Sequence, residues 1–206
     1  TIILIILPGL YFFFFEFNEL PLKERILVSI FQSITPRTAG FNTVNLNGVS
    51  EVGLIILIIL MLIGGSPGST AGGMKTSTIA VICASIISVF KNKGNAEIFK
   101  KRISDENVKK AFAIFFLYLF IFLFSGLIIS KIENISVLSG LFETASAIGT
   151  VGLTLGITPT LCLVSKIILI MLMFFGRIGG LTLIYATLGE GKKQFYNYPL
   201  EKIMVG

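Results

Sequence analysis

Long apolar runs constrain the fold of this 206-residue chain more than any other feature. They extend over residues 54–63, 79–90, 111–129 and 161–175, and several approach the ~20 residues that a helix needs to cross a bilayer. Hydrophobic residues make up 54% of the chain and the mean hydropathy is +0.91, above the usage of ordinary soluble domains. We therefore expect an all-α integral membrane protein with several crossings.

The chain carries a formal net charge of +6, and its basic residues are concentrated in one segment between apolar runs. Between positions 91 and 110 they are Lys91, Lys93, Lys100, Lys101, Arg102, Lys109 and Lys110. Short loops rich in lysine and arginine stay on the cytoplasmic side of a membrane, so we place this segment inside the cell. Topology and contact with lipid headgroups account for these charges, and no nucleic-acid partner is expected.

Histidine is absent, and the two cysteines, Cys83 and Cys162, lie in separate apolar runs. This content predicts neither a zinc site nor a disulfide, and we expect no tightly bound cofactor. The chain begins at Thr1 inside an apolar stretch, with no initiator methionine or basic segment ahead of it. We therefore interpret it as part of a longer protein.

A shift of 112 residues superimposes two parts of the sequence and reveals an internal repeat. The aligned positions are Thr38-Ala39-Gly40-Phe41 with Thr150-Val151-Gly152-Leu153, Gly64 with Gly176, Gly68 with Gly180, and Thr70 with Thr182. Each copy has an apolar helix, a shorter segment ending in a Thr/Gly turn, and a second apolar helix interrupted by glycines. We predict repeats at 1–92 and 111–190, a cytoplasmic basic linker at 93–110 and a cytoplasmic tail at 191–206.

The segment before each Thr/Gly turn predicts a short helix. The first extends from about residue 20 to 34, and the second, capped by Asn134 or Ser136, ends near Ile148. A helix of this length reaches only about 20 Å, too little to cross a bilayer. We expect both helices to enter from the outside and return, so that each repeat contains a re-entrant helix followed by a Thr/Gly loop.

A re-entrant helix followed by Thr-x-Gly suits a cation pathway. A bare cation in hydrocarbon costs tens of kcal/mol, and backbone carbonyls in a narrow lumen can replace its water. Glycine is needed where this backbone adopts dihedrals closed to other residues. The alternative is a pair of ordinary extracellular turns. The candidate selectivity-filter residues are Thr38, Ala39, Gly40, Phe41, Asn42, Thr150, Val151, Gly152, Leu153 and Thr154.

A glycine-rich segment divides another apolar stretch. Its sequence is similar to that of a phosphate-binding P-loop, but Met74 separates the glycine from the lysine, which are adjacent in a P-loop. No βαβ pattern surrounds the segment either, so a nucleotide site is disfavoured. The flanking stretches, 52–63 and 77–90, would be helices of about 18 and 21 Å, which together make one broken crossing. We expect this break to face the pore. The candidate residues here are Gly64, Gly65, Ser66, Pro67, Gly68, Ser69, Thr70, Ala71, Gly72, Gly73, Lys75 and, in the last apolar run, Arg177.

Three charged residues at membrane depth need partners. We expect Arg177, in the last apolar run, to hydrogen-bond the backbone of the broken segment; the alternative is that it extends to an interface. Lys75 either faces an aqueous vestibule or completes the hydrogen bonds of the loop. Glu143, on the second short helix, either anchors the filter backbone or serves as an acid in an intramembrane enzyme.

Several strings resemble the membrane subunit of bacterial Ktr/Trk potassium-uptake systems, closest to the Ktr branch. They are SITPRTAGFNTVNL (33–46), IGGSPGSTAGGMKTS (63–77), SAIGTVGLTLGITP (146–159), FFGRIGGLTL (174–183) and YPLEKIMVG (198–206). The resemblance implies four M1-P-M2 repeats of the potassium-channel kind, with re-entrant pore helices and filter loops, around one pore; this chain holds the third and fourth. It also implies that the glycine-rich segment is an intramembrane gate below the filter.

The same resemblance implies the surroundings of the protein. We expect a multi-pass protein of the bacterial cytoplasmic membrane that takes up K⁺, with Na⁺ as a coupling or activating ion. Its expected partners are the other half of the pore, a cytoplasmic nucleotide-binding regulatory (RCK-type) ring, and a second copy that meets residues 198–206. The alternative functions are an intramembrane protease or lipid transferase, and a scaffold.

Overall fold

The computed structural model describes residues 1–92 and 94–179. Helices dominate this part of the chain. In order, the elements are α1 (Ile2–Tyr11), the π-helix η1 (Phe12–Glu16), α2 (Leu22–Ile34), the 3-10 helix η2 (Leu46–Gly48), α3 (Glu51–Leu62), α4 (Thr76–Phe90), β1 (Glu97–Ile98), β2 (Lys101–Arg102), α5 (Asp105–Glu133), α6 (Val137–Ile148), the 3-10 helix η3 (Thr158–Thr160) and α7 (Leu163–Ile178). The expected tail, the contact at 198–206 and the end of the second repeat lie outside these residues.

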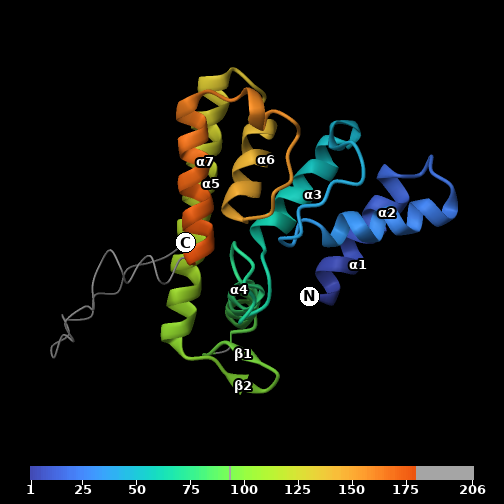
Figure 1. Cartoon of the computed structure of the whole chain (residues 1–206). Coiled ribbons are helices and arrows are strands. Elements are labelled where there is room, and N and C mark those ends of the chain that lie inside the picture. Colours follow the sequence, from blue (N-terminus) through green and yellow to red (C-terminus); the bar gives the residue numbers. More distant parts are fainter. Residues whose placement is uncertain (93, 180–206) are drawn as a thin grey trace.

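The two halves of the chain have a similar order of elements, which can be followed along the chain in Figure 1. In the second half, α6 runs back along α5 for part of its length, and the next segment returns to the end at which α6 began. From there α7 runs beside α5. In the first half, α2 follows α1 and η1, and an irregular segment then leads to α3. The order of elements thus agrees with the repeat found in the sequence.

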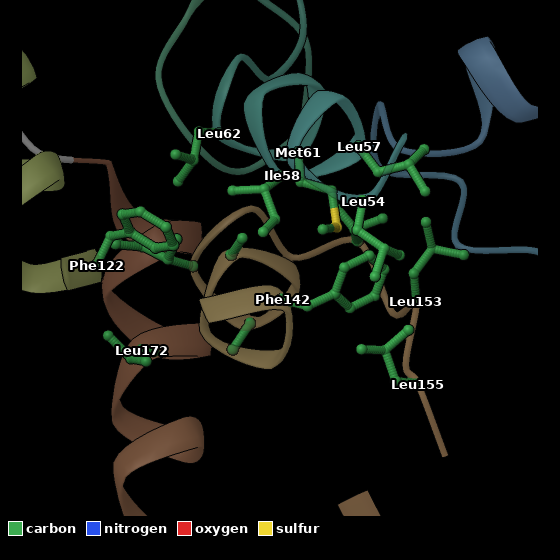
Figure 2. Packing of buried hydrophobic residues seen from close by; sticks show 14 of the residues in the cluster. Leu54, Leu57, Ile58, Met61, Leu62, Phe122, Phe142, Leu153, Leu155 and Leu172 are labelled. Atoms are coloured by element: carbon green, nitrogen blue, oxygen red, sulfur yellow. The ribbon is translucent and has the colours of Figure 1, made fainter. Parts of the chain in front are cut away.

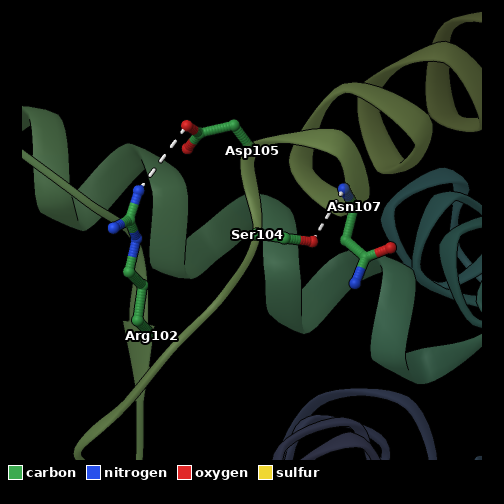
Figure 3. Close-up of polar contacts among 4 residues, drawn as sticks. All are labelled: Arg102, Ser104, Asp105 and Asn107. Carbon is green, nitrogen blue, oxygen red and sulfur yellow. Dashed lines mark hydrogen bonds and ion pairs between the residues drawn. The ribbon is translucent and has the colours of Figure 1, made fainter.

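Serine side chains begin three of the helices. The hydroxyl oxygens of Ser50, Ser104 and Ser136 accept hydrogen bonds from backbone N–H groups in the first turns of α3, α5 and α6. Figure 3 shows this cap at Ser104, beside an ion pair of 3.8 Å between Arg102 and Asp105. Of the two expected caps of α6, Ser136 is therefore correct. Asn134 instead ends α5, with a φ of 52°.

Among the described residues, α5 is the one helix that is long and apolar enough to cross a membrane, with 29 residues. Its first turns, 105–110, occupy the end of the segment expected as a linker. Ahead of α5, residues 97–102 form a hairpin with Phe99 and Lys100 at positive φ in the turn. The segment between α4 and α5 therefore contains a hairpin and the first turns of α5, and less of it is irregular than in the expected linker.

The glycine-rich segment separates α3 from α4, as the sequence predicts. In Figure 1, α3 is seen from the side and α4 nearly end-on, so the two helices are not coaxial. We expect glycines to interrupt the last apolar helix as well; α7 continues through Gly176 and ends at Ile178, before Gly179, and the residues from 180 on lie outside the described part of the chain. A Cβ at Gly176 would lie 1.9 Å from the carbonyl oxygen of Ile148, so this glycine permits close packing of α7 on the end of α6.

The core lies where α3 crosses α6 (Figure 2). Phe142 of α6 is fully buried there, and Leu153 closes the cluster from the segment after α6. The other labelled members come from α3, α5, α7 and the same segment: Leu54, Leu57, Ile58, Met61, Leu62, Phe122, Leu155 and Leu172. This packing fixes the end of α6 and the backbone that follows it. Apolar side chains on other faces of α5 and α7, such as Phe120 and Ile170, are exposed, which suits contact with lipid.

Candidate functional site

The two Thr-x-Gly turns share an unusual backbone conformation. Thr38 and Gly40 have φ values of 69° and 72°, and Thr150 and Gly152 have 51° and 98°. A β-branched residue at positive φ is a genuine outlier, and such strain persists where the surroundings impose it, often at functional sites. The internal repeat is therefore also a repeat of backbone geometry.

The two turns lie against each other. A Cβ on Gly40 would lie 2.0 Å from the carbonyl oxygen of Val151, so glycine is required there by space as well as by φ. The hydroxyl of Thr38 donates to the carbonyl oxygen of Gly149 over 3.4 Å. Because each turn follows the C-terminus of α2 or α6, the partly negative ends of both helices lie close to the same place.

Neighbouring candidate residues differ in exposure. Phe41 is 68% exposed, whereas Leu153, its repeat partner, is 1% exposed and packs in the core. Asn42 and Thr154 line one small cavity of about 190 Å³ beyond the two turns. The structure thus brings the two predicted filter segments together, although it buries only one of the two large side chains.

Each filter segment is anchored differently. In the first, the hydroxyl of Thr35 donates to the carbonyl oxygen of Phe41 over 2.8 Å. In the second, the carboxylate of Glu143 is buried and accepts hydrogen bonds from the Thr154 hydroxyl (2.5 Å), the Leu155 N–H (3.2 Å) and the Thr158 hydroxyl (2.8 Å). Of the two expected roles for Glu143, these contacts are those of an anchor.

The glycine-rich loop closes on itself at its neck. Ile63 and Met74 pair as a parallel β-bridge, and the N–H of Gly64 donates to the carbonyl oxygen of Met74 over 2.8 Å. These bonds satisfy backbone groups that have no helical partner. The tip of the loop, residues 66–68, is exposed and turns through a hydrogen bond from Ser69 N–H to the Ser66 carbonyl oxygen.

Basic side chains hold the carbonyl oxygens of this loop. Arg177 donates to Thr70 over 2.6 Å, which is the expected contact with the loop backbone. Lys75 donates to Ser69 over 2.9 Å and to Ala71 over 2.6 Å, so it completes the hydrogen bonds of the loop. A cavity of about 340 Å³ lies beside these contacts, lined by the loop, by Lys75 and by the last residues of α7.

A third cation, Arg37, was not identified from the sequence. It lies between α2 and Thr38, and its Nη2 donates to the carbonyl oxygen of Gly64 over 3.2 Å. Its Nη1 is buried and has no hydrogen-bond partner among the described residues. A basic residue between the C-terminus of a short apolar helix and a Thr-x-Gly turn is the signal that could have found it.

The loop also contacts the candidate filter directly. The N–H of Gly72 donates to the hydroxyl oxygen of Thr150 over 3.1 Å, and these residues are 78 positions apart in the chain. Candidate gate and candidate filter therefore form one connected site. The three cationic side chains of this site contact the loop, and the two Thr-x-Gly turns follow α2 and α6.

Comparison with known proteins identifies the family. The model of a family described as TrkH, a cation transport protein, matches residues 6–194. The chain belongs to the TrkH family of cation transport proteins. Within the TrkH family it is 40% identical over 189 residues to the potassium/sodium uptake protein NtpJ of Enterococcus hirae, covering 89% of this chain. It is 36% identical to the Ktr system potassium uptake protein B of Bacillus subtilis, covering 92% of this chain.

A solved structure shows the same TrkH fold. The potassium transporter TrkH of Vibrio parahaemolyticus superimposes with a TM-score of 0.74 at 22% identity over 90% of this chain. The alignments cover 42% of each of the three proteins named here, so the chain spans less than half of their length. The resemblance noted in the sequence to Ktr/Trk membrane subunits is thereby confirmed.

Proposed function

We propose that this chain forms part of a potassium-uptake pore in a bacterial cytoplasmic membrane, as two M1-P-M2 repeats with re-entrant pore helices. The observation that carries the proposal is the pair of Thr-x-Gly turns in contact, with matched positive φ at Thr38 and Gly40 and at Thr150 and Gly152. Potassium transport in named relatives of the TrkH family supports the choice of ion. The repeats would occupy residues 1–92 and 111–190.

In this proposal the two turns are parts of a selectivity filter. Their carbonyl oxygens replace the water of a dehydrated cation, which would otherwise cost tens of kcal/mol in hydrocarbon. The C-terminal ends of α2 and α6 add favourable potential for a cation. Thr35 and Glu143 hold the two segments in place through the hydrogen bonds described above.

The glycine-rich loop would be the gate below this filter. Its backbone lies within hydrogen-bond distance of Thr150, and its carbonyl oxygens are held by Arg37, Lys75 and Arg177. Three positive charges beside the path oppose the passage of a cation while the loop is in place. Loss of these contacts would release the loop into the cavity beside α7.

The whole transporter would include more than this chain. Since the chain covers 42% of its named relatives, we propose that the other half of the pore comes from the rest of a longer polypeptide. A cytoplasmic nucleotide-binding ring and a second copy at 198–206 are the further partners. The word sodium in the name of one relative makes Na⁺ a candidate coupling or activating ion.

An intramembrane enzyme is the weaker alternative. Glu143 lies on the short helix α6 next to the proposed filter, and its carboxylate accepts hydrogen bonds from Thr154, Leu155 and Thr158. That arrangement suits an anchor, whereas a catalytic acid needs access to a substrate.

Potassium uptake tests the proposed function. The full-length protein, expressed in a bacterium that lacks its own potassium-uptake systems, should restore saturable uptake. Gly40→Ser should raise the KM for K⁺, because it forces a side chain against Val151. If the KM is the same in the parent and the variant at equal expression, these turns are not the filter.

A further inference from the structure

The hydrogen bond from Gly72 to Thr150 joins the loop to a side chain of the proposed filter. The hydroxyl of Thr150 accepts the Gly72 N–H over 3.1 Å. A Cβ on Gly72 would lie 2.3 Å from the Thr150 hydroxyl oxygen and 2.9 Å from the carbonyl oxygen of Gly149. The backbone of the loop therefore fills the space directly next to the first turn of the filter segment.

A cation and an N–H group compete for the oxygen of this hydroxyl. A threonine hydroxyl has two acceptor lone pairs, and either an N–H donor or a cation binds through them. The hydrogen of an N–H group carries partial positive charge and repels a cation at the same oxygen. The position that a Cβ on Gly72 would take is within 3.0 Å of both the Thr150 hydroxyl oxygen and the Gly149 carbonyl oxygen, so the loop backbone borders the space in which these two oxygens could hold a cation.

We propose that the Thr150 hydroxyl is an oxygen ligand shared between the transported cation and Gly72, so that a cation at this end of the filter and the loop in its observed position exclude each other. The inference rests on the proposed function and adds a site to it. Occupation of the site by K⁺ displaces the loop, and closure of the loop removes an oxygen from the site. Gate and filter thus respond to the same ion.

Thr38 provides a matched control within the chain. It occupies the same position in the other repeat and also has positive φ. Its hydroxyl donates to the Gly149 carbonyl oxygen, and among the described residues no hydrogen bond joins its side chain to the loop. Thr38→Val therefore removes a filter hydroxyl without touching the bond that holds Gly72.

The test measures exposure of the loop in the full-length protein. A single reporter cysteine is introduced by Ala71→Cys, beside Gly72, and the native Cys83 and Cys162, with any others in the full chain, are replaced by serine. The rate of its reaction with a neutral maleimide is measured in detergent with saturating K⁺ or with choline. Potassium uptake is measured in parallel for each variant.

The expected results separate the two threonines. In the parent, K⁺ should accelerate the reaction relative to choline by about two- to tenfold, the range for loss of one hydrogen bond. Thr150→Val should react in choline as fast as the parent does in K⁺, and added K⁺ should cause no further change. Thr38→Val should keep the slow rate in choline. Thr150→Ser, which retains the hydroxyl, should behave as the parent and show that the valine effect is not misfolding.

Two outcomes of the labelling experiment would overturn the inference, and the KM for uptake tests the filter separately. The shared ligand is wrong if K⁺ does not change the rate in the parent, or if Thr150→Val and Thr38→Val react alike. In that case an increased KM for uptake in both variants still supports the filter. An unchanged KM in both variants instead refutes the filter itself.

Discussion

Arg177 donates a hydrogen bond of 2.6 Å to the carbonyl oxygen of Thr70, a residue 107 positions earlier in the chain. The bond joins the last turn of α7 to the middle of the glycine-rich loop. A charge-assisted bond of this kind contributes roughly 1.5 to 3 kcal/mol, enough to decide which position of the loop is populated. Four measurements follow from this geometry and from that of the filter.

Arg177→Gln should raise the maximal rate of potassium uptake several-fold and leave the KM, a property of the filter, nearly unchanged. Deletion of residues 66–71 should act in the same direction. The two changes together should be less than additive, because they remove one contact. Lys131→Gln, which neutralises an exposed lysine on α5, controls for the loss of charge. Lower flux at normal expression would mean that the arginine supports the open pore.

Gly40→Ser should raise the KM for K⁺ more than Gly152→Ser does. Both positions have positive φ, which costs about 1 kcal/mol for a side-chain-bearing residue. At Gly40 the new Cβ also meets the Val151 carbonyl oxygen at 2.0 Å, whereas at Gly152 the nearest atom is 4.0 Å away. Uptake at varied K⁺, with Na⁺ as competitor, measures the difference. Gly48→Ser, in open space, is the control, and equal effects at Gly40 and Gly152 would contradict the packing argument.

Glu143→Gln should raise the KM for K⁺ by about tenfold, which corresponds to ~1.4 kcal/mol. The carboxylate of Glu143 accepts hydrogen bonds from two hydroxyls and one N–H group, and the substitution replaces it by a neutral amide. Hydrogen bonds to a charged group are stronger than those to a neutral one. Glu51→Gln, at an exposed acid in the first turn of α3, is the matched control. A variant with parental KM and parental Na⁺ competition would show that the carboxylate does not hold the filter in its working geometry.

Single cysteines should report the proposed topology. At Asn45 and at Thr160, both exposed and close to the proposed outer mouth, they should react with a membrane-impermeant maleimide added to intact cells. At Lys101, in the hairpin before α5, a cysteine should react only after the cells are opened. Labelling of position 101 in intact cells would reverse the orientation of both repeats.

Much of the fold could be predicted because it depends on local sequence. The first short helix was expected at about 20–34 and occurs as α2 at Leu22–Ile34, while Ser136 caps α6 as one of two expected residues. The break after α3 follows from the several glycines and the proline in this segment, because both residue types are unfavourable inside a helix. Gly176 itself lies inside α7, where it permits close packing against Ile148, so the type of residue alone did not place the end of this helix.

The contacts within the site could be predicted only in part. An ionisable residue within an apolar run needs a partner, which was enough to expect the bond between Arg177 and the loop. Arg37 and the bond from Gly72 to Thr150 depend on how α3 packs against α6, and no local pattern encodes that packing. The role of each residue in transport stays a prediction.

In the first half the helix ends at Leu62, before the glycine that aligns with Gly176, whereas α7 passes Gly176 and ends at Ile178; this difference between the repeats has a consequence for how the proposed pore can evolve. In an assembly of identical subunits, every mutation appears in all copies at once. Here the duplicated units belong to one polypeptide and accumulate changes independently. One unit can therefore acquire a movable barrier without the same change in its counterpart, and selection can tune regulation without altering every side of the ion path.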